Sequence, residues 1–311
     1  MERPMTRESS GRILAGDEQP FSTAKATWRD YWDITKPGIN RANLIAVFAG
    51  FWLAGHETFD FGLLMVTLLG TALVIAGGCV VNNFIDRDID PLMTRTCNRP
   101  VAAGRIRPQT ALWMGVVYYL SGAVLLALLV NALTALLASL GFFIYVIVYS
   151  AWSKRTTPWN TLIGSVSGAV PPLVGWAAVT GSLDAAAWIL FMFMFIWQFP
   201  HFYALAMLKE EEYRTAGIPM LPVVKGGAET KRQILLFVLM MLPSSLLLFA
   251  TGVVGWIYFA TALILGSLWI FLAFRGLSQD VKTWARHMFL YSLLYLTLMQ
   301  AAMFLDPVVL G

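Results

Sequence analysis

The chain has 311 residues, of which 58% are hydrophobic and 13% are charged, and its mean hydropathy is +0.67. A soluble protein of this size does not need so much apolar surface, so we expect a polytopic membrane protein. The net charge of +4 does not indicate nucleic-acid binding, because the basic residues follow the membrane topology described below. Two cysteines, Cys79 and Cys97, are too few for a disulfide framework or a structural zinc site.

The N-terminal residues 1–32 are polar, and Gly, Ser and Pro are scattered through them. We predict a flexible cytoplasmic tail here and one transmembrane domain over residues 33–311. The tail lacks an apolar stretch followed by a cleavage site, so we expect the first spanning helix to direct insertion. Residues 30–40 are predicted to lie at the membrane surface, with Tyr31 and Trp32 at the level of the headgroups.

Nine apolar segments follow, each long enough to cross about 30 Å of hydrocarbon as a helix. They predict an all-α, polytopic fold of about nine transmembrane helices. We also expect a break in the fifth helix at Pro171 and Pro172, of the kind found where helices line a cavity. The predicted spans lie near residues 39–56, 62–85, 108–130, 132–152, 160–181, 185–207, 233–251, 253–274 and 287–305.

The basic residues predict the orientation of these helices. All 22 Lys and Arg residues fall in segments that lie inside if the N-terminus is inside: the tail as far as Arg41, and residues 86–107, 153–159, 209–232 and 275–286. The charged residues of the outer segments are all acidic, namely Glu57, Asp60, Asp184 and Asp306. Basic residues concentrate on the cytoplasmic side of membrane proteins. We therefore expect a cell-membrane protein with a cytoplasmic N-terminus and an external C-terminus.

Three aspartates and two asparagines end the second apolar segment. Asn82, Asp86 and Asp90 are spaced by four, and Asn83 precedes Asp86 by three, so either set lies on one face of a helix, whereas Asp88 points elsewhere. Acids at the C-terminal end of a helix oppose its dipole, and a bound cation would compensate them. Carboxylate and amide oxygens bind Mg²⁺, which usually shares its coordination shell with substrate phosphates.

Basic residues follow at the same side of the membrane: Arg95, Arg99, Arg105 and Arg107. Guanidinium matches phosphate oxygens, so the acids and arginines together suggest a Mg²⁺–diphosphate site. The arginines alone are equally explained as basic residues of a solvated loop that only set the membrane orientation. Acids at the membrane edge, in contrast, are costly and usually functional. Lys154 and Arg155 end the fourth segment. They either set the membrane orientation or bind the diphosphate from a second side.

A second group of polar residues ends the sixth apolar segment, which also ends inside. Gln198 and His201 lie in the sequence WQFPHF, where Pro200 removes a helical hydrogen bond. His201 is either a core histidine bonded to a neighbouring backbone group, or a metal ligand, a general base or a phosphate contact. The acids that follow form either a solvated face or a second cation site: Glu210, Glu211 and Glu212.

These motifs resemble the UbiA superfamily of intramembrane prenyltransferases and, more narrowly, its protohaem IX farnesyltransferase branch. The resemblance extends from Thr35-Lys36-Pro37 to the ninth apolar segment. The Asn-Asn pair and the segment around His201 favour the haem branch over enzymes that prenylate quinone precursors. The motifs that carry it are Asn82-Asn83-x-x-Asp86-x-x-x-Asp90, Arg95-Thr96-x-x-Arg99-Pro100, Tyr149 with Lys154-Arg155, Trp197-Gln198-x-Pro200-His201-Phe202 and Ala216-Gly217-x-Pro219-Met220-Leu221-Pro222.

The resemblance implies a bundle of nine helices around a central cavity that opens to the cytoplasmic side. It implies that the chain, surrounded by membrane lipid, joins farnesyl diphosphate to protohaem IX (haem B) and gives haem O. The product would pass to a haem A synthase or a terminal oxidase. One departure from the family pattern is Glu212-Tyr213, where an Asp-Tyr pair is expected; glutamate can still bind Mg²⁺, through a longer side chain.

The resemblance and the residue types together assign roles to the site. Mg²⁺ and basic side chains would neutralise the departing diphosphate and so lower the barrier to an allylic cation. The expected Mg²⁺ ligands are Asn82, Asn83, Asp86, Asp90 and Glu212. The expected diphosphate ligands are Arg95, Arg99, Lys154 and Arg155. The expected catalytic residues are Asp86, Asp90, Asn83, Arg95 and Lys154. His201 is the candidate axial ligand of the haem iron.

Two other functions are compatible with parts of the sequence. A prenyltransferase that acts on an aromatic acid such as 4-hydroxybenzoate would share the first motif, although the segment around His201 argues against it. A transporter could also contain acids and a proline-broken helix. Transporters usually place such groups near mid-membrane, whereas these acids and arginines crowd one face.

Overall fold

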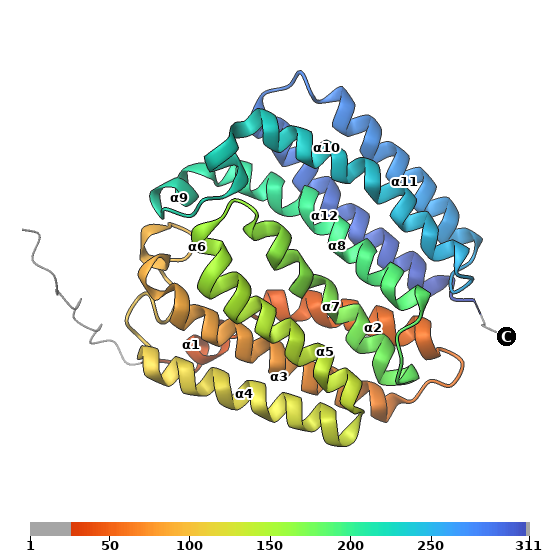
Figure 1. The fold of residues 1–311 in the computed structure, drawn as a ribbon, viewed down its shortest axis with the longest axis horizontal. Helices are drawn as coiled ribbons and strands as arrows, with labels where there is room; N and C mark the ends of the chain where they lie inside the picture. The colour runs from red at the N-terminus through yellow and green to blue at the C-terminus, as the bar shows by residue number, and fades with distance from the viewer. Residues whose placement is uncertain (1–25, 309–311) are drawn as a thin grey trace, which may run out of the picture.

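Nine long helical segments form the bundle shown in Figure 1. The computed structural model describes residues 26–308, so most of the predicted tail lies outside the described residues. Within that range, the chain is helical apart from its loops and one isolated bridge between Val254 and Pro307. The long segments are α2 (Pro37–Gly55), α3 (Phe61–Ile85), α4 (Pro108–Leu129), α5 (Ala132–Phe143) continued by η3 (Ile144–Ser153) and α6 (Lys154–Thr156), α7 (Asn160–Thr180), α8 (Ala185–Leu208), α10 (Leu221–Ala250), α11 (Trp256–Arg275) and α12 (Val281–Leu305).

Eight of these segments are long and apolar enough to cross a membrane. The exception is α2, which has Asn40, Arg41 and Asn43 in its first two turns. The prediction of an all-α polytopic fold with about nine helices is therefore confirmed. The shorter elements are α1 (Trp28–Asp33), α9 (Glu210–Thr215) and the 3-10 turns η1 (Asp86–Asp88) and η2 (Asp90–Leu92).

Two helices begin earlier than their apolar runs predict. α10 begins at Leu221 rather than near residue 233, because a polar stretch continues the helix, with a kink at Gly226 where φ is 77°. α12 begins at Val281 rather than near residue 287, because the Asp280 side chain accepts a hydrogen bond from the Thr283 amide and caps the first turn. Hydropathy alone does not register such polar helical turns.

Close contacts between α2 and α7 hold the centre of the bundle together. A Cβ atom added at Gly50 would lie 2.0 Å from the Pro172 carbonyl oxygen, and one added at Gly175 would lie 1.9 Å from the Val47 carbonyl oxygen. Small residues at such positions let two membrane helices approach closely. The break expected at Pro171 and Pro172 is not formed, because α7 continues through both prolines while packed against its neighbours.

The polar connections gather at one end of the bundle, at the upper left of Figure 1. They comprise the segment after α3, the end of the fourth spanning segment at α6, the segment around α9 and the loop between α11 and α12. An apolar cluster that includes Ile89, Met93, Ile218 and Met220 joins the segment after α3 to the segment after α9. The fold therefore brings the two predicted polar motifs to the same end.

Candidate active site

The end of α3 buries the four predicted metal ligands of the first motif. Asn82 and Asn83 lie in the last turn of α3, whereas Asp86 and Asp90 begin the 3-10 turns η1 and η2. The predicted face therefore continues past the end of the α-helix, and all four residues are at most 3% exposed. Asp88 points away, as predicted, with 58% of its side chain exposed.

Asp86 forms a buried ion pair with Lys154. The Lys154 ammonium lies 2.5 Å from Asp86 Oδ2, which also accepts a hydrogen bond of 2.9 Å from the Asn82 amide. The other oxygen, Asp86 Oδ1, has no hydrogen-bond partner, although the Arg155 guanidinium lies 3.8 Å away. The structure therefore leaves one oxygen of a fully buried carboxylate available for a ligand.

Two of the predicted diphosphate ligands also pair with acids. Arg99 lies 2.8 Å from both carboxylate oxygens of Asp90. Arg155 donates to both oxygens of Asp88, at 2.6 and 2.7 Å, and to the Ile85 carbonyl oxygen. Together with Lys154, these arginines surround the acidic end of α3. Each of these cations has further N–H donors that could bind a phosphate oxygen beside its carboxylate partner.

A π-helical segment brings Lys154 to α3. The fourth spanning segment changes from α-helix to π-helix over η3, which ends directly before Lys154. Within η3, Ser150 donates a hydrogen bond of 2.8 Å to the Tyr145 carbonyl oxygen and accepts one of 2.9 Å from Asn82. π-Helical turns are rare and occur frequently at functional sites. Sequence reasoning did not assign a role to Ser150.

Lys36 is a second site residue that sequence reasoning missed. Its ammonium donates a hydrogen bond to Asn82 Oδ1 and lies 3.5 Å from the Tyr145 hydroxyl. Burial lowers the pKa of Lys36 to about 8, and the nearby Arg99 charge acts in the same direction. Within residues 26–308, Lys36 is the one non-glycine residue with positive φ, at 52°. A lysine directly before Pro37 was a usable signal, because positive charge is disfavoured at a helix N-terminus.

The asparagine pair differs in what it offers a ligand. Asn82 uses its amide nitrogen toward Asp86 and its oxygen toward Lys36. Asn83 donates to the Cys79 carbonyl oxygen at 2.8 Å, and its own Oδ1 atom is buried without a hydrogen-bond partner. Asn83 is thus better placed than Asn82 to give an oxygen to a cation.

Glu212 and Arg95 meet where the two polar segments touch. Glu212 accepts a hydrogen bond of 2.8 Å from Lys209 and one of 3.4 Å from the backbone amide of Arg95. The hydrogen bond from Lys209 is the main reason that the pKa of Glu212 is lowered. The Arg95 guanidinium lies 3.5 Å from the Tyr213 hydroxyl. Glu212 therefore faces the loop of the first motif, although no hydrogen bond joins it to Asp86 or Asp90 within residues 26–308.

His201 projects from α8 against α12. Its ring stacks between those of Trp197 and Phe289, at 4.8 Å from each, and its Nδ1 atom lies 2.9 Å from the Ser292 hydroxyl oxygen. These contacts come from α8 and α12, whereas the acids project from the end of α3. The structure thus packs the His201 ring firmly without bringing it against the acidic cluster.

The donor atoms fit a metal shared with a substrate better than one held by protein alone. In the part of the chain that the structure describes, no group of three or more His, Cys, Asp or Glu side chains is arranged to hold a metal ion. Asn83 Oδ1 and Asp86 Oδ1 nevertheless stay buried without partners, which is costly for polar oxygens. Mg²⁺ binds through one or two carboxylates and completes its shell with water and phosphate. These residues fit that mode.

Comparison with known proteins gives matches over most of the chain. The pattern of the UbiA prenyltransferase family matches residues 43–294. The chain is 48% identical over 295 residues to Protoheme IX farnesyltransferase of Alkalihalophilus pseudofirmus, covering 92% of this chain and 93% of that protein. It is 49% identical over 284 residues to the protein of the same name from Exiguobacterium sibiricum, covering 87% and 90%.

Solved structures share the fold at low sequence identity. A structure of digeranylgeranylglyceryl phosphate synthase matches with a TM-score of 0.76 and 19% identity, covering 89% of this chain and 97% of that one. A UbiA homolog from Archaeoglobus fulgidus bound to GPP and Mg²⁺ matches with a TM-score of 0.64 and 14% identity, covering 88% and 99%. At these identities, the likeness establishes the fold alone.

Replacing Lys154 with Met is expected to destabilise the protein strongly. The substitution leaves Asp86 charged and buried without its closest cation, and breaking a buried pair in this way typically costs about 3–5 kcal/mol. The matched control is Arg214→Met, which removes a half-exposed pair with Glu210 and should cost less than about 1 kcal/mol. Thermal unfolding in detergent measures both. Adding Asp86→Asn to Lys154→Met should restore much of the lost stability, and a double variant no more stable than the single one would contradict this account.

Proposed function

Because the chain belongs to the UbiA prenyltransferase family, we propose that it transfers a farnesyl group from farnesyl diphosphate to protohaem IX. The observation that carries the choice of acceptor is the high identity, over nearly the whole chain, to proteins named Protoheme IX farnesyltransferase. This favours haem over an aromatic acid as acceptor. The product, haem O, would then be used by a haem A synthase or a terminal oxidase.

The proposed reaction begins with departure of diphosphate. The bond between the allylic carbon and the diphosphate oxygen breaks, and the electron pair leaves with the diphosphate. A vinyl group of protohaem IX then bonds to the allylic carbon, and water adds to the cation left on the haem side chain. That water loses a proton, so the haem gains a hydroxyfarnesyl group. Negative charge develops on the diphosphate, and preorganised cations lower the barrier most at that point.

The basic residues around α3 suit this task. Lys154 and Arg99 lie 2.5 and 2.8 Å from the carboxylates of Asp86 and Asp90, at the place where a diphosphate would meet the acids. Bound Mg²⁺ would neutralise further charge on the leaving group. Asn83 and Asp86 have the oxygens best suited to hold it. We also propose Asn82, Asp90 and Glu212 as further metal ligands, and Arg95 and Arg155 as further diphosphate ligands.

The proposed activity predicts a specific product. Purified protein in detergent, given protohaem IX, farnesyl diphosphate and Mg²⁺, should form haem with an added hydroxyfarnesyl group, detected by mass spectrometry. Chelating Mg²⁺ should abolish the product. Asp86→Asn should also abolish it, whereas Asp88→Asn, which changes an exposed acid two residues away, should retain most activity.

Other products would point to the other functions. Prenylation of 4-hydroxybenzoate without any haem product would assign the chain to the aromatic-acid enzymes. Folded protein that prenylates neither acceptor would leave a transport or binding role. Full activity in Asp86→Asn would refute the assignment of Asp86 while leaving the reaction intact.

His201 is proposed as the axial ligand of the substrate haem. Its Nδ1 atom is bonded to Ser292, which leaves the other ring nitrogen for iron. His201→Phe should keep the stacking with Trp197 and Phe289, and therefore the fold, while removing the ligand. We expect weaker haem binding, measured by absorbance titration, with unchanged affinity for farnesyl diphosphate. His56→Phe is the control. Equal loss of both affinities, or unchanged haem affinity, would rule out this role.

We propose that the protein lies in the cell membrane with its acidic end at the cytoplasm. The support is that the end holding the first motif also holds the basic connections. Cys97 reports on that end, because it is partly exposed whereas Cys79 is buried. A maleimide that cannot cross membranes should label Cys97 only after cells are permeabilised. Labelling in intact cells would reverse the proposed orientation.

A further inference from the structure

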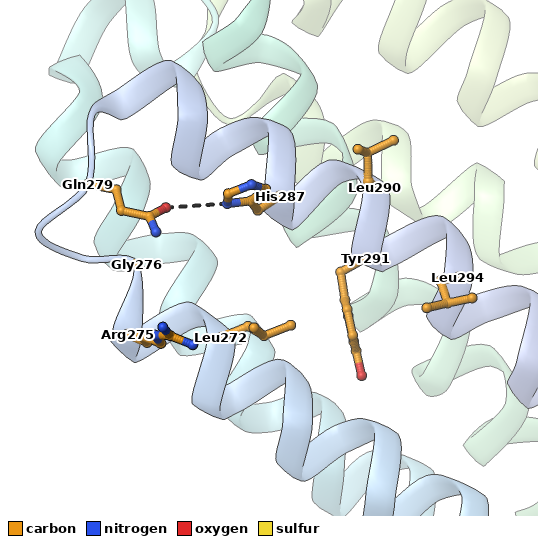
Figure 2. Close-up of a pocket in the computed structure, with 8 residues that line it drawn as sticks. All are labelled: Leu272, Arg275, Gly276, Gln279, His287, Leu290, Tyr291 and Leu294. Carbon is orange, nitrogen blue, oxygen red and sulfur yellow. Dashed lines mark hydrogen bonds between the residues drawn. The ribbon is translucent and has the colours of Figure 1, made fainter.

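A cavity lies between α11 and α12 (Figure 2), two helices on the opposite side of the bundle from α3 in Figure 1. We refer to it as the α11–α12 groove. Its volume is about 490 Å³, within the range of small-molecule sites. Polar side chains lie at one end of the groove and apolar ones along the rest: Arg275, Gln279 and His287, then Leu272, Leu290 and Leu294. The groove is therefore amphipathic along its length.

The polar end of the groove is held in place by neighbouring residues. His287 Nδ1 lies 3.3 Å from Gln279 Oε1, the contact drawn as a dashed line in Figure 2. Lys231 of α10 donates hydrogen bonds to the carbonyl oxygens of Leu277 and Gln279, at 3.2 and 2.9 Å. The loop that closes this end is thus fixed from two sides.

Charge at this end of the groove favours an anion. Arg275 forms no ion pair within residues 26–308. The two segments at this end of the groove contain six Lys or Arg residues, Arg275 included, and two acids. They are residues 225–232 and 275–287. Basic side chains between membrane helices attract anionic headgroups. An unpaired guanidinium at the rim of a cavity is the group that a phosphate would bind.

The apolar part of the groove opens toward the surrounding membrane. Leu290 and Leu294 are 51% and 49% exposed, and they continue the apolar outer surface of α12. A ligand can therefore enter sideways from the bilayer, with its head at Arg275 and its apolar body along the leucines. Haem carboxylates on a porphyrin share this chemistry, but the elongated groove along the lipid-facing surface suits an acyl chain.

We propose that the α11–α12 groove binds one anionic glycerophospholipid. Its phosphate lies against Arg275, and one acyl chain lies along Leu272, Leu290 and Leu294. The site is separate from the acidic cluster, because all of its lining residues lie between Leu272 and Leu294, on α11, α12 and the loop that joins them. It does not depend on the reaction that the protein catalyses.

Native mass spectrometry of the whole protein in detergent tests this site. Phosphatidylglycerol should bind more tightly than phosphatidylcholine of the same chain length. Arg275→Gln should weaken phosphatidylglycerol binding about fivefold, since one basic side chain near an anionic surface is worth about that factor. The matched control is Arg286→Gln, which removes the same charge from an exposed position of α12 outside the groove and should weaken binding far less than Arg275→Gln.

A variant that fills the groove distinguishes binding in the groove from a general attraction between the anionic lipid and the basic surface. Leu294→Trp keeps every charge but occupies the apolar part, so it should also weaken phosphatidylglycerol binding. Equal effects of Arg275→Gln and Arg286→Gln would overturn the proposal, as would equal binding of the two lipids. Protohaem binding that Arg275→Gln removes, without any effect on lipid, would assign the groove to haem instead. Unchanged melting temperatures exclude misfolding as the cause.

Discussion

The buried ion pair between Asp86 and Lys154 is the interaction on which the acidic end of the bundle depends. It joins the end of α3 to the end of the π-helical segment, at 2.5 Å. An unpaired carboxylate at this depth would be costly, and so would an unpaired ammonium. The hydrogen bonds from Asn82 to Asp86 and to Ser150 fix the same pair of helices. The charges therefore determine how closely these two helices approach.

Pairing of acids with cations is compatible with the proposed binding of both a metal and a diphosphate at one site. Asp86, Asp88 and Asp90 each have a basic partner, and Lys36 adds a cation that none of these acids pairs with. The site thus has a local excess of positive charge, which favours a dianionic or trianionic ligand.

Small residues in the centre of the bundle support this arrangement from a distance. Gly50 and Gly175 let α2 and α7 approach to backbone contact. Lys36 lies directly before the first residue of α2, so the position of that helix decides where its ammonium points. The positive φ of Lys36 costs about 1–3 kcal/mol and persists because its surroundings hold it. Packing far from the acids thus contributes to the geometry of the site.

The sequence by itself determined the all-α polytopic fold and the family. Hydropathy, the distribution of basic residues and the spacing of Asn82, Asp86 and Asp90 are local properties of the chain, so they can be read without coordinates. The acids, the asparagines and most of the basic residues of the acidic cluster were also named from sequence, whereas Lys36 and Ser150 were not. The separation of exposed Asp88 from its buried neighbours followed from helical periodicity alone.

Only the tertiary structure decided which groups meet. It paired Arg99 with Asp90, brought Lys36 and Ser150 to Asn82, and placed His201 of α8 against Ser292 of α12. These contacts join residues up to 91 positions apart, and they depend on helix packing and on a π-helical turn that no local pattern reveals. The α11–α12 groove likewise arises from the shape left between two helices. Long-range packing has no signature in a single sequence, which is why these features required the folded chain.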